Sequence, residues 1–287
     1  MAMAAAVETL TKWQSPCVLC PRECRAQRRM GETGFCRVPF SLRLASVGPH
    51  FGEESPLVGR GGSGAIFLAG CNLLCAFCQN WEISHGARGD ECDVAHLTRI
   101  MLALQESGCH NINFVTPTHY APQIAAAILA ARESGLRIPI VYNCGGYEKI
   151  ETLRLLAGLI DIYMPDFKFM DSAAAARYLQ APDYPEVAKA ALQEMQRQVG
   201  DLEIINRVAR RGLLVRHLIM PGYGADSMAI IDFLASLSPR LYLNAMGQYR
   251  PCHEASRYSE ISRKPYAAEI TAVRLYARQK GLRLDER

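Results

Sequence analysis

Short apolar runs alternate with amphipathic helical stretches along most of this chain, and this alternation limits the folds open to it. From about residue 64 onward, each of six runs rich in aliphatic and aromatic residues is followed by a stretch with helical periodicity. This pattern indicates βαβ units, in which buried parallel strands lie between helices. The predicted strands are residues 65–69, 111–116, 138–142, 159–164, 213–220 and 241–246. The predicted helices are residues 94–107, 121–134, 148–157, 185–199, 226–237 and 265–280.

The number of repeats predicts a barrel that does not close. Six strands joined by right-handed crossovers can form an open barrel, whereas a closed eight-stranded barrel needs two more repeats than the sequence contains. A chain of 287 residues can form one large α/β domain with a small appendage. We therefore expect an α/β fold, an incomplete (β/α)6 TIM-like barrel over residues 59–287, with a small cysteine-rich N-terminal extension over residues 1–58.

Bulk composition narrows the classes of function. No apolar run approaches the roughly 20 residues of a membrane span, and the N-terminus lacks the features of a secretory signal. We therefore expect a cytoplasmic protein without membrane contact. A net charge of +4 is too small at this length to indicate nucleic-acid binding. Eleven cysteines is a high count, and in a reducing compartment it indicates metal binding or catalysis rather than disulfides.

Three cysteines follow the first predicted strand in a C-x3-C-x2-C arrangement. Cys71, Cys75 and Cys78 share one short loop, and the aromatic Phe77 precedes the last of them. Structural zinc takes four protein ligands, and a cubane cluster has four irons to ligate. Three thiolates on such a cluster leave an open coordination position, where a small molecule can bind, so the loop predicts a reactive site. A zinc site completed by a histidine such as His85 is the alternative that the residue types leave open.

This loop resembles the cluster loop of radical S-adenosylmethionine (radical SAM) enzymes, and residues 65–70 resemble the first barrel strand of that superfamily. The chain as a whole is most similar to relatives of the pyruvate formate-lyase activating enzyme whose substrates are uncharacterised. The resemblance implies that Cys71, Cys75 and Cys78 hold a [4Fe-4S] cluster that binds S-adenosylmethionine at its open iron. It further implies that a flavodoxin- or ferredoxin-like donor supplies the electron for cleavage, giving a 5′-deoxyadenosyl radical that abstracts hydrogen from a substrate.

Cofactor contacts are implied at the end of the second strand as well, but the usual motif is missing there. Many radical SAM enzymes carry Gly-Gly-Glu at this place, where it contacts the amino group of the cofactor. Here Thr116, Thr118 and His119 occupy the matching position and can supply polar contacts. A helix cap is the alternative role for Thr118, because a helix is predicted from about residue 121.

The later strand ends match the activating enzyme more closely. Asn143 stands in a segment similar to its Thr-Asn-Gly step, and Asp166 with Lys168 is similar to its Asp-x-Lys step. Residues two apart on a strand point to the same side, so both could contact one ligand, and a surface ion pair is the alternative. Arg216 lies in an apolar strand and needs an anionic partner, for which a carboxylate ligand is suited. His217 should face the opposite side as a core histidine.

A second set of cysteines precedes the barrel. Cys17, Cys20, Cys24 and Cys36 make a four-thiolate set, which indicates a metal site with a structural or electron-transfer role. Zinc and a second iron–sulfur cluster both suit thiolate ligands, and the spacing does not decide between them. A zinc ribbon that binds nucleic acid is a rival use, although the local basic cluster is small.

The expected function is therefore a radical SAM oxidoreductase similar to glycyl-radical-enzyme activases. Its substrate could be a glycyl residue of a partner glycyl radical enzyme, another peptide or a small molecule. The alternative from a different class is a non-catalytic zinc-binding adaptor or a nucleic-acid-binding protein. The metal content of the protein separates the two, because iron indicates the enzyme and zinc indicates the adaptor.

Overall fold

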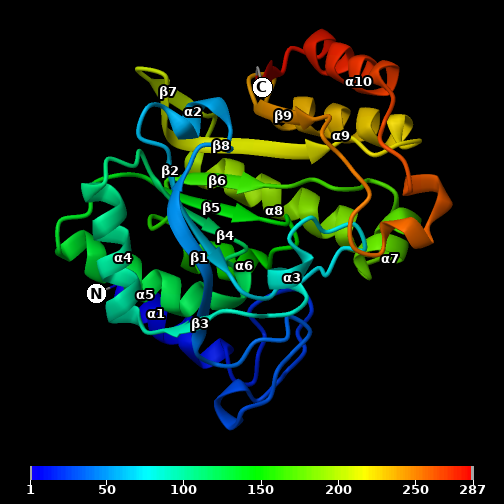
Figure 1. Cartoon of the computed structure of the whole chain (residues 1–287). Coiled ribbons are helices and arrows are strands. Elements are labelled where there is room, and N and C mark those ends of the chain that lie inside the picture. The colour runs from blue at the N-terminus through cyan, green and yellow to red at the C-terminus, as the bar shows by residue number, and fades with distance from the viewer. Residues whose placement is uncertain (1, 286–287) are drawn as a thin grey trace.

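One twisted sheet organises the protein (Figure 1). The computed structural model describes residues 2–285, and within them the sheet has ten strands. Six parallel strands lie side by side in chain order at its centre. They are β2 (Ser63–Leu68), β4 (Ile112–Val115), β5 (Ile140–Cys144), β6 (Ile162–Pro165), β8 (Val208–Leu218) and β9 (Tyr242–Met246). All six were predicted, and the α/β partial barrel is confirmed.

The sheet stays open at both ends. At one end β1 (Leu42–His50) pairs antiparallel with β2, and β3 (Asp90–Cys92) pairs antiparallel with β1. At the other end the short β10 (Arg283–Leu284) pairs with β9, and β7 (Glu203–Ile205) forms a hairpin with β8. Within the described residues, no pairing joins the two ends.

The strands at the sheet ends were not predicted because they are very short or carry exposed residues. The strand β1 lies within residues 1–58, which were assigned to the cysteine-rich extension, yet it joins the main sheet. The extension therefore shares its last strand with the barrel.

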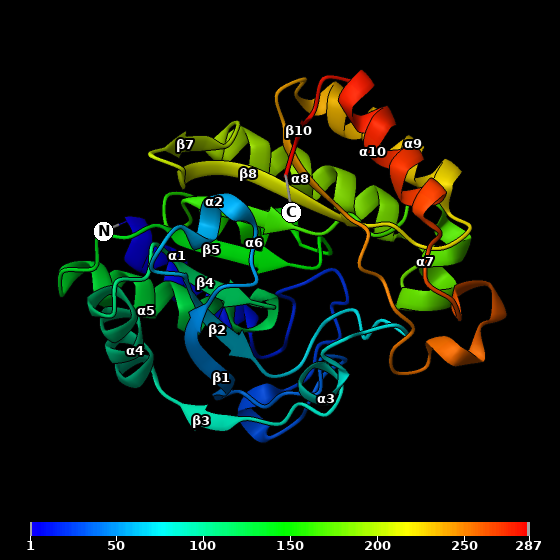
Figure 2. The ribbon, with the colours of Figure 1, turned by 45° about the horizontal axis from the view of Figure 1, so that its top comes forward.

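Helices cover the sheet on its outer side (Figures 1 and 2). Those in the predicted places are α4 (Val94–Glu106), α5 (Ala121–Glu133), α6 (Ile150–Leu155), α8 (Tyr184–Val199), α9 (Gly224–Leu237) and α10 (Ala267–Gln279). The additional helices are α1 (Ala2–Trp13), α2 (Ser55–Val58), α3 (Trp81–Ser84) and α7 (Ser172–Leu179). Helix α1 packs against α5 and α6. None of the helices described over residues 2–285 combines the length and apolarity needed to cross a bilayer.

The central strands form the core because both of their faces are covered. Ile66, Phe114, Tyr142 and Tyr163 are fully buried, one on each of four neighbouring strands. Parallel strands place their C-terminal ends at one edge of the sheet, and in barrels of this type functional residues gather there. The N-terminal loops and α3 lie side by side near this edge in both Figure 1 and Figure 2.

Candidate active site

Four polar side chains form one hydrogen-bonded group at the C-terminal edge of the sheet, called here the strand-end group. The carboxylate of Asp166 accepts hydrogen bonds from Nζ of Lys168 at 2.5 Å and from Nε of Arg216 at 2.8 Å. Arg216 also donates from Nη2 to Oδ1 of Asn143 at 2.7 Å. All four residues were predicted as cofactor contacts from three different strands, and the structure brings them together.

The strand-end group is largely shielded from water, since the charged side chains are 16–19% exposed. Burial alone would raise the pKa of Asp166, but Arg216 and Lys168 outweigh it and hold that pKa below its ordinary value. Burial acts to lower the pKa of Lys168 and Arg216, yet the Asp166 carboxylate raises both. The guanidinium and ammonium groups of this set are donors of the kind that suits a carboxylate ligand.

The partner of Arg216 differs from the one expected. A ligand carboxylate was expected to pair with it, and Asp166 of the protein itself does so. The pair of Asp166 with Lys168 is not the surface ion pair considered as an alternative, because both side chains are mostly buried. His217 faces away as expected, with its ring nitrogens bonded to the Phe167 carbonyl at 2.7 Å and to Ser227 Oγ at 2.8 Å.

The three cysteines of the C-x3-C-x2-C motif lie in the loop that leaves the C-terminal end of β2, called here the cysteine loop (residues 70–80). Gly70, with φ 84°, and Leu74, with φ 51°, adopt left-handed conformations that turn the loop tightly. The loop is joined to the segment that follows β5, because Asn72 donates from Nδ2 to the Tyr147 carbonyl at 2.7 Å. The predicted reactive loop therefore lies at the same edge as the strand-end group.

The thiols of the cysteine loop are close enough for their charges to interact. Burial raises the pKa of Cys71 and of Cys75, and the neighbouring thiolates raise it further. The ammonium of Lys168 lowers the pKa of Cys75, and the N–H of Leu73 lies 3.4 Å from Sγ of Cys71. Cys78 contributes to the repulsion at both other thiols. Such buried thiols lose their protons readily only when a cationic centre binds them.

His85, considered as a fourth zinc ligand, bonds elsewhere. Its Nδ1 lies 2.9 Å from Oγ of Ser84, and that hydroxyl lies 3.2 Å from Sγ of Cys78. Across residues 2–285, no three His, Cys, Asp or Glu side chains surround a position for a single metal ion. A cubane cluster places its ligands on separate irons and does not need them around one point.

The three residues predicted after β4 are only partly directed at the strand-end group. The backbone N–H of Thr116 donates to a carbonyl at the end of β5 at 2.8 Å. Thr118 is buried and donates to Glu148 at 2.6 Å. His119 is buried and donates from Nε2 to the Ala69 carbonyl at 2.8 Å, and burial lowers its pKa to about 3, so it is neutral. Cofactor contacts from these residues stay a prediction.

Two buried carboxylates near the site were not predicted from the sequence. Glu148 accepts hydrogen bonds from Thr118 and, at 3.2 Å, from Tyr142. Glu54 accepts one from Asn244 at 2.9 Å, and its charge acts on Arg216. A signal was available only for Glu148, which lies two residues beyond the pair of glycines that follows β5.

Replacing Glu148 with glutamine should remove a pH dependence of stability. Burial raises the pKa of Glu148 from 4.5 to about 7, so the folded protein binds a proton that the unfolded chain releases. The free energy of unfolding should therefore fall as the pH rises from about 4.5 to about 7. Between pH 5 and 8 the wild type should lose about 2 kcal/mol more than E148Q, as measured by urea unfolding. The exposed Glu186→Gln is the control, and equal pH profiles for wild type and E148Q would contradict the assignment.

The four N-terminal cysteines also lie together, in a segment called here the cysteine knuckle (residues 17–36). The negative charge of a Cys17 thiolate raises the pKa of Cys20 and of Cys36. That of a Cys24 thiolate raises the pKa of Cys17 and of Cys36. Three of the thiols are buried, and that of Cys24 is exposed. Burial raises the pKa of Cys36 to about 11 even though Arg28 opposes it. Like the cysteine loop, this set does not surround a single-ion position within residues 2–285, so a metal here, zinc or a second iron–sulfur cluster, stays a prediction.

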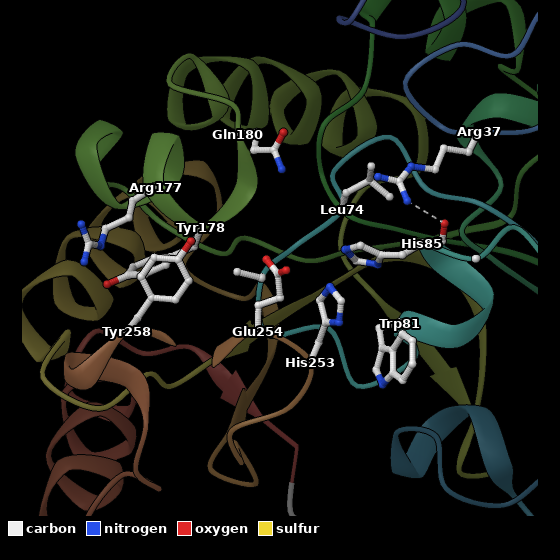
Figure 3. Close-up of a pocket in the computed structure, with 12 residues that line it drawn as sticks. Arg37, Leu74, Trp81, His85, Arg177, Tyr178, Gln180, His253, Glu254 and Tyr258 are labelled. Atoms are coloured by element: carbon white, nitrogen blue, oxygen red, sulfur yellow. Dashed lines mark hydrogen bonds between the residues drawn. The ribbon is translucent and has the colours of Figure 1, made fainter. Parts of the chain in front are cut away.

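A cavity of about 510 Å³ adjoins the cysteine loop (Figure 3). It is bounded by the cysteine loop and α3, by the end of α7, by residues 253–258 and by Arg37 next to the knuckle. Figure 3 shows Arg177 on one side and His85 with Trp81 on the other, with Glu254 between them. Its volume is in the range of small-molecule sites, and its walls carry charges of both signs.

The backbone around this cavity is unusual. Four residues that line it have a positive φ although they are not glycine: Arg37 (62°), Leu74 (51°), Gln180 (52°) and His253 (51°). Such conformations carry a steric cost and concentrate at functional sites. Gln180 has a local reason, because it ends α7 in a left-handed cap. The other three have no helix cap to explain them, which makes the cavity a candidate substrate site.

A known protein family matches the part of the chain that contains the candidate site. A profile of the Radical SAM superfamily matches residues 65–234. That range begins in β2 and includes the cysteine loop and the strand-end group.

Two archaeal proteins and one solved structure are similar to the chain. Uncharacterized protein MJ0674 of Methanocaldococcus jannaschii is 30% identical over 264 residues, 88% of this chain and 72% of that protein. Uncharacterized protein MJ0808 of the same organism is 28% identical over 246 residues, 76% of this chain and 65% of that protein. The crystal structure of methylornithine synthase (PylB) superposes with a TM-score of 0.52 at 13% identity, over 77% of this chain and 63% of that one. At this identity the likeness to PylB is one of fold.

Proposed function

The chain belongs to the radical SAM superfamily, and we propose that the cysteine loop and the strand-end group together bind the two cofactors of that superfamily. The supporting observation is that three interacting thiols of one loop lie beside a cationic group at the C-terminal edge of the sheet. When bound, a four-iron cluster and S-adenosylmethionine supply one-electron chemistry that abstracts a hydrogen atom from a substrate. The protein supplies binding, orientation and exclusion of water.

The residues present fit this pair of groups. Cys71, Cys75 and Cys78 offer three thiolates and no fourth, which leaves a coordination position for a ligand. The ammonium of Lys168 lies near Cys75 and favours its thiolate. Arg216 and Lys168 offer cationic N–H donors beside the cysteine loop, which suit the carboxylate of S-adenosylmethionine.

The cavity beside the cysteine loop supports a polar substrate with charged groups of both signs. Arg37 and Arg177 offer guanidinium groups, and Glu254 offers a carboxylate. Trp81 is 42% exposed and stacks on His253 with ring centroids 5.3 Å apart, so a flat apolar surface is also available. A peptide segment of a partner protein, including a glycyl radical enzyme, or an amino-acid-like small molecule would suit this lining. The electron is proposed to come from a flavodoxin- or ferredoxin-like donor.

The cofactor assignment can be tested without knowing the substrate. Protein purified and reconstituted without oxygen should be brown, should contain about four irons per chain at the cysteine loop, and with dithionite should convert S-adenosylmethionine to 5′-deoxyadenosine. Added substrate should increase the rate of this conversion, so candidate peptides and amino acids can be screened with the same assay. Colourless protein that carries zinc at Cys71, Cys75 and Cys78 would contradict the assignment and favour the non-catalytic alternative.

A further inference from the structure

The cysteine knuckle is folded back on itself by its own backbone. The N–H of Cys17 donates to the Ala26 carbonyl at 3.0 Å, and the N–H of Arg25 donates to the Cys17 carbonyl at 2.9 Å. A further turn is closed by the N–H of Glu23, which donates to the Cys20 carbonyl at 3.0 Å. These bonds bring the first three cysteines of the knuckle into one small unit.

Arginines that alternate with the knuckle cysteines extend to the reactive part of the protein. Arg22, between Cys20 and Cys24, donates from Nε to the carbonyl of Asn72 in the cysteine loop at 2.9 Å. It also donates to the carbonyls of Leu179 and Gln180 at the end of α7. Arg22 therefore joins the knuckle, the cysteine loop and one wall of the cavity.

A second arginine connects the knuckle to the start of the cysteine loop. Arg28 is 1% exposed and donates to the Pro39 carbonyl at 3.1 Å and to the His119 carbonyl at 2.8 Å. His119 in turn donates to the carbonyl of Ala69, two residues before Cys71. A fully buried arginine is costly unless its N–H groups are satisfied, and these carbonyls satisfy it only while the knuckle is folded.

The knuckle also touches the cysteine loop directly. A Cβ added to Gly70 would lie 2.5 Å from the carbonyl oxygen of Cys36 and 2.4 Å from Cγ1 of Val38. Gly70 immediately precedes Cys71, so only a residue without a side chain fits between the two cysteine sets. Arg37, next to Cys36, donates to the His85 carbonyl at 3.1 Å just beyond the loop.

We propose that the four knuckle cysteines bind a metal centre through their thiolates, and that this binding holds the cysteine loop in its folded position. The two sets of cysteines therefore bind their metals and gain stability together. This rests on the proposed function, since it assumes a cluster at the cysteine loop. The physical reason is that the free energy of metal binding by such a segment is free energy of folding. When the knuckle is folded, Arg22 and Arg28 keep their hydrogen bonds to the backbone carbonyls of Asn72 and His119. When it unfolds, these bonds are lost and the loop that carries Cys71 is no longer held.

Removing one knuckle thiol tests the coupling. Cys20→Ala should lose the second metal, zinc or additional iron, by elemental analysis, and should release iron from the cysteine loop to a chelator at least severalfold faster than wild type. The electron paramagnetic resonance signal of the reduced cluster should also lose its response to S-adenosylmethionine. Cys109→Ala, a buried cysteine outside both sets, is the matched control and should behave as wild type.

A second variant keeps the thiols and removes only the connection. Arg22→Ala should retain the second metal, yet should release cluster iron severalfold faster, whereas Arg25→Ala, with an exposed side chain in the same knuckle, should not. Circular dichroism verifies folding, and if Cys20→Ala is unfolded then the Arg22 comparison decides.

Three results would overturn the proposal. They are a wild type without metal beyond the cysteine loop, a Cys20→Ala protein that loses its metal with unchanged iron release, and an Arg22→Ala protein with wild-type release. Absence of iron at the cysteine loop itself would instead refute the proposed function.

Discussion

Cys75→Ala should reduce the formation of 5′-deoxyadenosine from S-adenosylmethionine to the background of the protein-free reaction. Cys75 is the most shielded thiol of its loop at 7% exposure, and its neighbours include Lys168 and Asp166 of the strand-end group. Two remaining thiolates cannot hold a four-iron cluster in the orientation that leaves one position open. The measurement is product formation after anaerobic reconstitution, with dithionite as the reductant and iron content determined on the same samples.

A control variant must show that the effect of Cys75→Ala comes from losing a cluster ligand and not from losing any buried cysteine side chain. Cys109→Ala removes a thiol that is 3% exposed and lies outside both cysteine sets. It should keep both iron and product formation, with only a modest cost in stability from the small cavity. Sustained turnover by Cys75→Ala would show that this thiol is not a cluster ligand.

Asp166→Asn should lower the free energy of unfolding by about 3 kcal/mol, because it leaves two largely buried cations without their carboxylate. Arg216 and Lys168 both depend on Asp166, at 2.8 Å and 2.5 Å. The loss should appear at neutral pH and shrink in acid. The pKa of Asp166 is lowered by folding, so its contribution is present above the ordinary pKa near 3.8 and is lost as the pH falls through the lower, folded value. Urea unfolding at a series of pH values measures both effects.

An exposed ion pair provides the comparison. Asp232 pairs with Lys280 at 2.6 Å, but both side chains are well exposed. Asp232→Asn should therefore change stability too little to resolve, since exposed pairs contribute little. If the two substitutions had equal effects, the strand-end group would not be a buried electrostatic unit.

The repeating part of the fold could be predicted because its signals are local. Strands such as β2 and β6 contain continuous apolar runs, and the length of these runs is visible in the sequence. The strand β1 could not be found this way, because much of it is exposed and it owes its place to pairing with β2. Helix α7 was missed as well, although Asp171 caps its start with a side-chain bond to the Ala173 N–H at 2.8 Å.

The candidate site likewise has residues that could be predicted from the sequence and contacts that could not. Asp166 and Lys168 were identified from their place after a strand and their similarity to an Asp-x-Lys step, and Arg216 was identified as a charge within an apolar strand. That Asp166 neutralises Arg216 could not be foreseen, because the pairing joins residues 50 positions apart through strand register. Thr118 and His119 have the expected positions but hydrogen-bond to Glu148 and to Ala69. Their side-chain directions depend on a tight turn after β4, where Thr116 has φ 63°.

The amino-acid order alone determined the βαβ succession, the three-thiol loop and the four-thiol knuckle, since periodicity and ligand spacing are properties of neighbouring residues. Only the tertiary structure decided that the knuckle lies against Gly70 and that Arg22 and Arg28 connect it to the loop. The reason is physical: contacts between segments far apart in the chain depend on how the sheet brings those segments together, and no local pattern encodes that distance.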